Sequence, residues 1–432
     1  MGVTREDRVG PRRGRRAIRG ALAAACALVG VHAAPARATV IDTGLLYYGE
    51  LSRVTAVEAV GSLRQEFANG RTGTLRLVYD ALTGASPNGA TPARAAQTFT
   101  SPSGMSGYRV APGTTPLDGT FRDNRVELSA DGTLPLDRLT TVGLGVRFSG
   151  ESDYHSLGLN GSLSRDLNDR NTTLSAALSF DHDTVSPQGG VPVPFSAMPA
   201  PAPSSGEGEG EGGGGPGVGK DVVGAVLSAT QVLDRSTLLA ASWSVSRLSG
   251  YQSDPYKLMS VVDPVNGEPV RYLYESRPES RLRHAVYGQL KRDLGRFTLD
   301  LDYRWTGDDW GVRSHAVDLH TRWDLNDRQF VQPHVRWYRQ TAADFHRLFL
   351  VNGAGLPDHA TADARLDAFT AWTFGLKHGR TLANGHLLTV RGEYYHQIGE
   401  RHPVAAFGDL RDFSLFPALD AVIVQVGYSF GT

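Results

Sequence analysis

The feature that most constrains the fold of this chain is an alternation of apolar and polar side chains with a period of two. Between Phe297 and Thr306 every odd position is apolar or aromatic, whereas the even positions hold threonine and the charged residues Asp300, Asp302 and Arg304. Side chains of a β-strand point alternately to opposite faces, so this segment predicts a strand with one apolar and one charged face. A helix would mix both kinds of residue around its circumference.

The length of the alternating segments favours a membrane barrel over a soluble sandwich or solenoid. Many of them run for about ten residues or more, which is the length a tilted strand needs to cross a bilayer. Strands of globular proteins are mostly about five or six residues long. We therefore expect an all-β fold, a transmembrane antiparallel up-and-down β-barrel with an apolar face toward lipid and a polar face toward the lumen. No later segment has the roughly 18 consecutive apolar residues of a membrane-spanning helix.

The connections between these segments alternate between short and long. The turn at 68–71 contains Asn69-Gly70, a strong hairpin signal. Outer-membrane barrels have short periplasmic turns and long extracellular loops, which here are 84–119, 182–220, 248–280, 341–364 and 398–416. This assignment predicts about sixteen strands with both termini in the periplasm; fourteen stays open because 40–50 alternates poorly. The predicted strands are 40–50, 54–67, 72–83, 120–132, 140–150, 154–166, 172–182, 221–233, 236–247, 281–293, 296–306, 311–323, 329–340, 365–378, 385–397 and 417–430.

The first residues have the layout of a secretory signal peptide. Arginines precede the apolar run Ala21–Val31, and Ala36-Arg37-Ala38 is a small-x-small cleavage site. We expect a signal peptide at 1–38 and a barrel domain at 39–432 in the outer membrane of a Gram-negative cell. Cys26, the single cysteine, lies in the apolar run. Lipoprotein processing at Cys26 is the alternative, and cleavage after Ala38 leaves no cysteine for disulfides, metal ligands or nucleophiles.

The charge balance of the expected mature chain excludes nucleic acid as a partner. Residues 1–38 hold eight arginines and two acids, so 36 basic and 43 acidic residues remain and the net charge is −7. A mildly acidic chain without a basic stripe does not suit a phosphate backbone. The expected partners are outer-membrane lipid and the outer-membrane assembly machinery. The last strand resembles the signal read by that machinery, although Gly431-Thr432 follows its aromatic Phe430.

The polar face predicts a charged lumen lining. Carboxylates and arginines on neighbouring strands would form paired charges across the wall. Such residues can select ions; the structural alternative, which we favour, is a ladder that rigidifies the wall. The two readings are compatible. The predicted lumen-lining residues are Asp300, Asp302, Arg304, Asp318, His320, Arg322, His334, Arg336, Tyr338, Arg391 and Glu393.

Other candidate sites carry weaker signals. The clusters 181–183 and 344–347 combine histidine with acids, but such surface groups are usually solvated, and we predict no metal site. No Gly-x-Ser-x-Gly elbow or nucleophile–base pair can be assembled, so we expect neither an enzyme nor a cofactor. The glycine-rich stretch Gly206–Gly219 is a flexible linker by composition. The loop 84–119 is expected to be ordered, folded into the channel or over it as a lid.

Several spaced segments resemble a known family. They are Thr83–Pro92, Gln97–Thr100, Val110–Gly113, Thr115–Asp118, Arg277–Arg281, Asp308–His315 and Gln340–Phe345. Together they resemble the bacterial exported family catalogued as domain of unknown function 3570, over nearly all of the mature chain. The resemblance implies an outer-membrane barrel, found beside a flavin-transferase-type maturation protein and thioredoxin-like periplasmic proteins. It implies no catalytic residues.

Two functions follow from these expectations. The first is a channel or transport protein with a charged lumen, because sixteen strands can enclose water. The alternative is a barrel scaffold that docks or houses a periplasmic redox partner.

Overall fold

Sixteen antiparallel strands form a closed barrel. The structure, a computed structural model, describes residues 36–431 apart from 52, 101–106, 188 and 200–216. The barrel is sealed where β1 (Ala36–Glu50) pairs with β21 (Leu419–Gly431). The expected fold class and strand number are confirmed. β1, which alternates poorly, is paired with both of its neighbours, so the alternative of fourteen strands is wrong.

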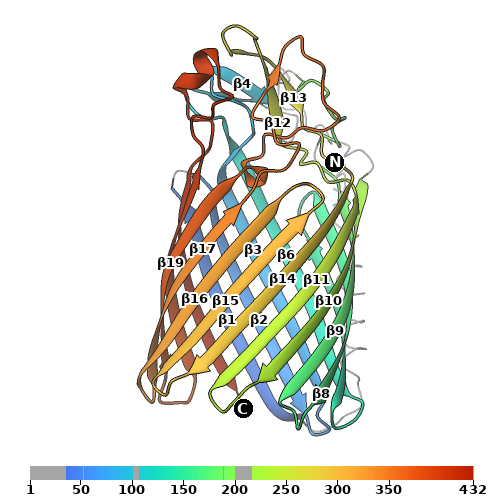
Figure 1. Cartoon of the computed structure of the whole chain (residues 1–432), viewed down its shortest axis with the longest axis vertical. Helices are drawn as coiled ribbons and strands as arrows, with labels where there is room; N and C mark the ends of the chain where they lie inside the picture. Colours follow the sequence, from blue (N-terminus) through green and yellow to red (C-terminus); the bar gives the residue numbers. More distant parts are fainter. Residues whose placement is uncertain (1–35, 52, 101–106, 188, 200–216, 432) are drawn as a thin grey trace, which may run out of the picture.

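The barrel strands follow one another in an up-and-down order. The short turns and the C-terminus lie at the lower end in Figure 1, and the long connections lie at the upper end. The remaining strands, in sheet order, are β2 (Thr55–Phe67), β3 (Thr72–Pro87), β6 (Leu117–Pro135), β7 (Thr140–Gly150), β8 (Tyr154–Leu167), β9 (Thr172–Val185), β10 (Val218–Val232), β11 (Thr237–Gly250), β14 (Ser280–Asp293), β15 (Phe297–Asp308), β16 (Arg313–Asn326), β17 (Gln329–Gln340), β19 (Phe369–Thr381) and β20 (Leu387–Gly399).

The short turns form as the local sequence predicts. Between β2 and β3, the N–H of Phe67 donates to the carbonyl of Arg71 at 3.0 Å. Gly70 has a φ of 78°, in the left-handed region that glycine adopts without strain. The side chain of Asn69 accepts from the N–H of Arg71 at 3.2 Å. The Asn-Gly turn therefore fixes the register of the first hairpin.

Strand ends differ from the alternation pattern mainly at the upper rim. β6 begins at Leu117 and ends at Pro135, beyond the expected 120–132 at both ends. The strand expected at 365–378 begins only at Phe369, because residues 364–366 form a 3-10 turn, η1 (Ala364–Leu366). The carboxylate of Asp363 accepts from the N–H of Arg365 and caps that turn. Local capping thus overrides the alternation at this rim.

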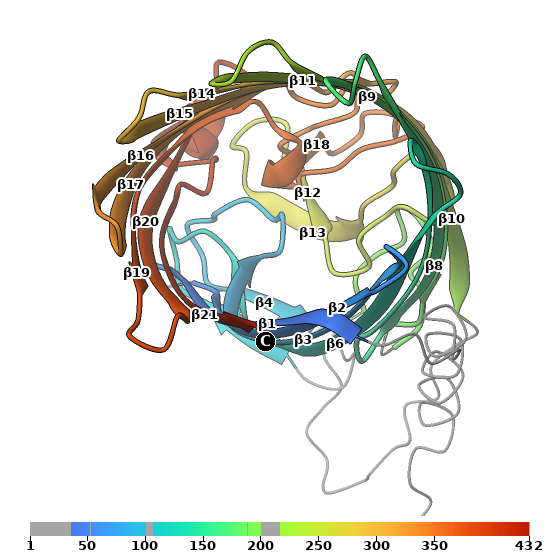
Figure 2. The same cartoon turned by 90° about the horizontal axis from the view of Figure 1, so that it is seen from below.

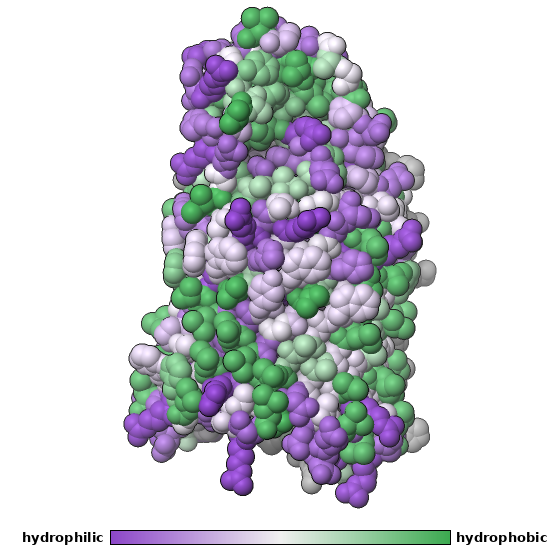
Figure 3. Space-filling view, in the orientation of Figure 1, coloured by the Kyte–Doolittle hydropathy of each residue, from purple (hydrophilic) through white to green (hydrophobic). Residues whose placement is uncertain are grey.

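Large apolar side chains of the strands face outward. Leu178 in β9 is 68% exposed, and Leu174 and Phe180 on the same face are also exposed. Figure 3 shows apolar residues gathered over the strands, above a hydrophilic rim of short turns. Soluble monomers rarely expose apolar surface on this scale. An outer face of this kind is that of an outer-membrane-type barrel.

The long connections fold into a compact unit at the upper end, which we call the cap. It comprises the described parts of 88–116, 186–199, 251–279, 341–368 and 400–418. Figure 2 shows its strands within the circumference of the barrel. The cap contains a sheet of β12 (Leu258–Val262), β13 (Pro269–Tyr274) and β18 (Leu350–Val351), the hairpin β4 (Gln97–Thr100) with β5 (Gly107–Val110), and the 3-10 helix η2 (Gly408–Asp412).

The cap has an apolar core of its own. Met259, Val261 and Leu273 pack together and are almost fully buried. Phe99 of β4 is likewise buried, between the rings of Tyr108 and Tyr272. Packing of this kind holds the described parts of the loop 84–119 at the mouth of the barrel.

Two expected segments lie largely outside the described residues. These are the signal peptide at 1–38, of which Ala36–Ala38 begin β1, and the glycine-rich stretch Gly206–Gly219. Within the part of the chain that is described, no helix has the length and apolar character to cross a membrane.

Candidate functional site

The expected lumen-lining residues share one face of the sheet. Asp300 and Asp302 of β15 lie opposite His320 and Asp318 of β16 in the strand register. The register continues to β17, where His320 faces His334. Apolar residues such as Leu301 occupy the alternate positions and are exposed on the other face.

Contacts with the cap identify this polar face as the inner one. Gln340 ends β17 on the same face as Arg336 and Tyr338, two residues apart in each case. The side-chain amide of Gln340 donates to the carbonyls of Arg365 and Asp367 in the cap, at 3.0 and 2.7 Å. Because the cap lies within the circumference of the barrel (Figure 2), this face is turned inward. We call it the inner face.

Most expected lining residues are paired along the wall. On β15, Asp302 accepts from the hydroxyl of Tyr287 at 2.5 Å, and Asp300 accepts from the amide of Gln289 at 2.8 Å. Arg304 lies over the ring of Tyr287, 5.6 Å from its centre. The wall therefore contains a ladder of cross-strand contacts between polar side chains.

Four further expected residues lie at different heights along the wall. Near the short turns, Arg322 pairs with Asp324 at 2.9 Å and lies over the ring of Phe330. Near the cap, the hydroxyl of Tyr338 donates to Gln340 at 2.7 Å. Between these levels, Arg336 lies 3.7 Å from Asp318, and Arg391 lies 3.5 Å from Glu393. The eleven residues are thus spread over the wall rather than gathered into one pocket.

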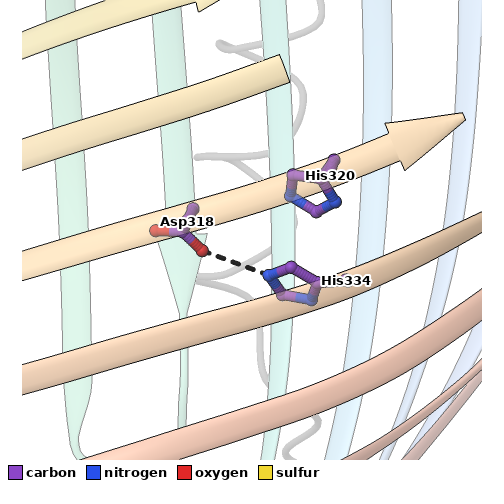
Figure 4. Close-up of side chains that lie close together, drawn as sticks. All are labelled: Asp318, His320 and His334. Atoms are coloured by element: carbon purple, nitrogen blue, oxygen red, sulfur yellow. Dashed lines mark hydrogen bonds and ion pairs between the residues drawn. The ribbon is translucent and has the colours of Figure 1, made fainter. Parts of the chain in front are cut away.

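One group within this set converges on a histidine. Figure 4 shows Asp318 and His320 on β16 beside His334 on the neighbouring strand. His334 donates from Nδ1 to Glu393 at 2.9 Å and lies 3.2 Å from Asp318 through Nε2. The rings of His320 and His334 are stacked, with centres 4.0 Å apart. Two imidazoles and two carboxylates therefore meet at one place on the inner face.

Glycines allow side chains to meet across an intervening strand. Glu393 of β20 and His334 of β17 both lie opposite Gly375 of β19, and Glu393 passes over this glycine. A Cβ at position 375 would lie 2.8 Å from the Cγ of Glu393. In the same way, Arg147 of β7 reaches Asp181 of β9 at 2.7 Å, over Gly158 of β8. The absence of a side chain at Gly375 and Gly158 therefore makes room for these polar contacts.

The opposite wall holds a charged group that the sequence analysis did not single out. Arg125 pairs with Asp80, and Arg147 lies 3.8 Å from Glu127 and 2.7 Å from Asp181. Asp80 is buried among these contacts. The alternation of Asp123, Arg125 and Glu127 is the signal that could have revealed it.

The two weaker histidine clusters have separate partners. His182 pairs with Asp221 at 2.7 Å, while Asp183 on the other face of β9 pairs with Lys220 at 3.1 Å. His346 lies 3.5 Å from Asp367 inside the cap. Neither cluster gathers its members around one point.

Buried ion pairs hold the cap together. Arg277 lies 2.7 Å from Glu275 and 2.8 Å from Asp363, and Arg365 bridges Asp363 and Asp254. Burial alone would raise the pKa of the Asp363 carboxyl, but the nearby Arg365, Lys257 and Arg277 outweigh it and hold that pKa well below its ordinary value. Asp363 is therefore charged.

A cavity of about 710 Å³ lies between the cap and the upper ends of β6, β8 and β10. Its lining includes the acidic residues Asp123, Glu151 and Asp153 and the basic residues Lys220 and Arg122. Burial, together with a hydrogen bond to Asp123 and the charges of Asp123 and Asp153, raises the pKa of Glu151 to about 7. Both signs of charge thus meet at the barrel mouth.

A family model described as "Protein of unknown function (DUF3570)" matches residues 19–430. The chain belongs to this family. The resemblance seen in the spaced motifs is confirmed. No curated protein sequence matches the chain.

Several solved structures are similar to this chain at low identity. CdiB from Acinetobacter baumannii has a TM-score of 0.47 and 8% identity, over 91% of this chain and 60% of that chain. A mutant ferric enterobactin receptor (PfeA) from Pseudomonas aeruginosa has a TM-score of 0.43 and 11% identity, over 90% and 59%. The CymD monoaromatic hydrocarbon channel has a TM-score of 0.39 and 8% identity, over 95% and 92%. This chain therefore spans about 60% of the length of the first two.

Three of the spaced segments, Arg277–Arg281, Asp308–His315 and Gln340–Phe345, meet where the cap joins the barrel. Arg281 pairs with Asp308 and lies 4.3 Å from the ring centre of Trp310. The indole N–H of Trp310 donates to the carbonyl of Ser280 at 2.8 Å, and its ring packs edge-on against Phe345. These three segments thus build the joint between the cap and the barrel.

Proposed function

We propose that the protein is an outer-membrane channel, whose charged lumen passes small polar solutes and whose cap controls entry from outside the cell. The observation that carries the proposal is the division of each strand into an apolar outer face and an ion-paired inner face, in a closed barrel of sixteen strands. A barrel of this size can enclose an aqueous lumen.

The inner face suits a wet passage. Carboxylates and basic groups on it are paired across strands, as in Arg147–Asp181 and Lys291–Asp300. Paired charges avoid the cost of isolated ions and keep the wall polar. Rings of charge also discriminate between ions, so the ladder and a selective lining are compatible.

The position and order of the cap support the proposal that it controls the entry of solutes at the long-loop end of the barrel. Its apolar core and buried ion pairs make it an ordered unit within the barrel circumference (Figure 2). The cavity beside Glu151 and Lys220 offers a route at its edge. Solutes would then pass between the cap and the strand ends.

Single-channel recording in planar bilayers tests the proposal. We expect stepwise conductance from the refolded full barrel. We also expect Asp302→Lys to shift the reversal potential toward anions, because it adds two units of positive charge to the inner face. Arg271→Ala, an exposed position of the cap, serves as the control and should leave the conductance unchanged.

The scaffold alternative gives the opposite result in the same preparation. Absence of conductance together with co-purification of a periplasmic redox protein would contradict the channel and favour a docking barrel. The flavin-transferase-type and thioredoxin-like proteins implied by the family resemblance are the partners to seek.

A further inference from the structure

We propose that Asp318, His320 and His334 form a binding site for a divalent transition-metal ion on the inner wall of the barrel, with Glu393 orienting His334. This proposal goes beyond channel activity, because metal binding requires no conduction. The strand register creates the arrangement: Asp318 and His320 are two residues apart on β16, and His334 lies opposite His320. Their ligand atoms all lie within 4.8 Å of one another.

The chemistry of the three side chains selects the ion. Two imidazole nitrogens and one carboxylate oxygen suit Zn²⁺ and neighbouring ions such as Co²⁺ or Ni²⁺. Mg²⁺ and Ca²⁺ prefer oxygen ligands throughout. Three protein ligands leave a position for water or for a solute in the lumen.

Glu393 gives the arrangement a feature typical of metal sites. Histidines that bind metals usually donate their other ring N–H to a carboxylate, which fixes the ring and leaves one nitrogen for the ion. His334 donates from Nδ1 to Glu393, and its Nε2 is turned toward Asp318 at 3.2 Å. This orientation depends on Gly375, since a side chain there would displace Glu393.

A doubly hydrogen-bonded imidazolium is the competing description of the same contacts. A protonated His334 would bridge the carboxylates of Asp318 and Glu393 without an ion. That description assigns no role to His320, which stacks on His334 and has no hydrogen-bond partner within the described part of the chain. A metal ion uses His320 as a ligand.

Binding requires a small closure of the three side chains. Ligand atoms that share an ion at about 2.1 Å lie at most about 4.2 Å apart. The ring of His320 must therefore tilt out of the stack (Figure 4), and any proton on Nε2 of His334 passes to water as the ion binds.

Calorimetry with Zn²⁺ and visible spectroscopy with Co²⁺, on the metal-stripped barrel in detergent, test the site. We expect one ion per chain and Co²⁺ absorption bands typical of nitrogen and oxygen ligands. His320→Ala and His334→Ala should each abolish the bands. His284→Ala, on the outer face beside Trp243, should leave binding unchanged. Excess Mg²⁺ should not displace the ion.

Two further variants separate the orienting role from ligation. Glu393→Gln and Gly375→Ala should each weaken binding by about 10–100-fold, because both remove the carboxylate from His334. The proposal is overturned if the wild-type barrel binds neither ion, or if His320→Ala binds as tightly as the wild type. Heat-dependent migration on gels verifies that each variant is folded, and conductance measured in parallel keeps this result distinct from that of the proposed channel.

Discussion

The acidic residues at the mouth show how single side chains create a pH-sensitive contact. Glu151 lies between Asp123 and Asp153, and the hydroxyl of Tyr256 in the cap donates to Asp153. Burial and these neighbours raise the pKa of Glu151 to about 7. Ionisation of Glu151 therefore places a third negative charge beside the contact that ties the cap to the β7–β8 connection.

This arrangement predicts that the cap loosens as the pH rises. The unfolded pKa of a glutamate is about 4.3, so between there and about pH 7 the folded mouth retains a proton that the unfolded chain has released. The stabilisation that protonated Glu151 gives the folded mouth is complete below the unfolded pKa of about 4.3. It is lost as the pH rises through the folded pKa of about 7. The rate of proteolysis within the cap should increase over this range, and in Glu151→Gln it should not. An unchanged pH dependence in that variant would contradict the assignment.

Residue positions on the inner face were predictable, but their partners were not. Alternation alone places His334 and Glu393 on polar faces. Their contact depends on a glycine in the strand between them, and on strand order and register that only barrel closure fixes. Alternation in the sequence therefore predicts the polar faces. The cluster of Asp318, His320, His334 and Glu393 can be recognised only from the strand order and register of the folded barrel.

At the scale of elements, the barrel strands were predictable and those of the cap were not. Long alternating segments predict barrel strands directly. β12 is a short apolar run, Leu258–Val262, of the kind expected for a buried strand, but it lies within the segment 248–280, which lacks the alternation of a barrel strand. Its parallel partner β18 comes from Leu350–Val351, far along the chain, and no local pattern reveals that pairing.

Buried ion pairs make the cap sensitive to a single substitution. Arg277→Ala would leave Glu275 and Asp363 buried without their shared partner, at a cost of about 3–5 kcal/mol. We expect the cap to become protease-sensitive while the barrel keeps its heat-dependent migration on gels. The exposed Arg271→Ala is the matched control and should resist protease like the wild type. Equal resistance of both variants would show that the pairs do not hold the cap.

At the scale of the whole molecule, the chain carries two apolar systems in different surroundings. The cap buries residues such as Met259 in its own core, as a soluble protein does. The strands expose residues such as Leu178 on the outer surface. Alternation along each strand keeps this outer surface apart from the polar inner face.

Neighbouring residues of β9 test this division. Leu178 is at the middle of the strand on the outer face, and Ser179 is on the inner face. Leu178→Lys should destabilise the barrel by about 2–4 kcal/mol in lipid, because it places a charge near the middle of the bilayer. Ser179→Lys should cost far less, since its charge meets the polar wall. Urea unfolding in vesicles measures both, and equal losses would argue against a lipid-facing outer surface.

The contacts over glycine also bear on how strand order can be read from pairs of positions. His334 and Glu393 touch although β19 lies between their strands, and Arg147 and Asp181 do so across β8. Substitutions at such positions would be expected to compensate one another as if their strands were adjacent. Strand order inferred from such coupled positions would leave out the intervening strand. A barrel built from that order would have too few strands. A strand glycine that lies opposite a charged or histidine side chain on both neighbouring strands marks a place where coupling skips a strand.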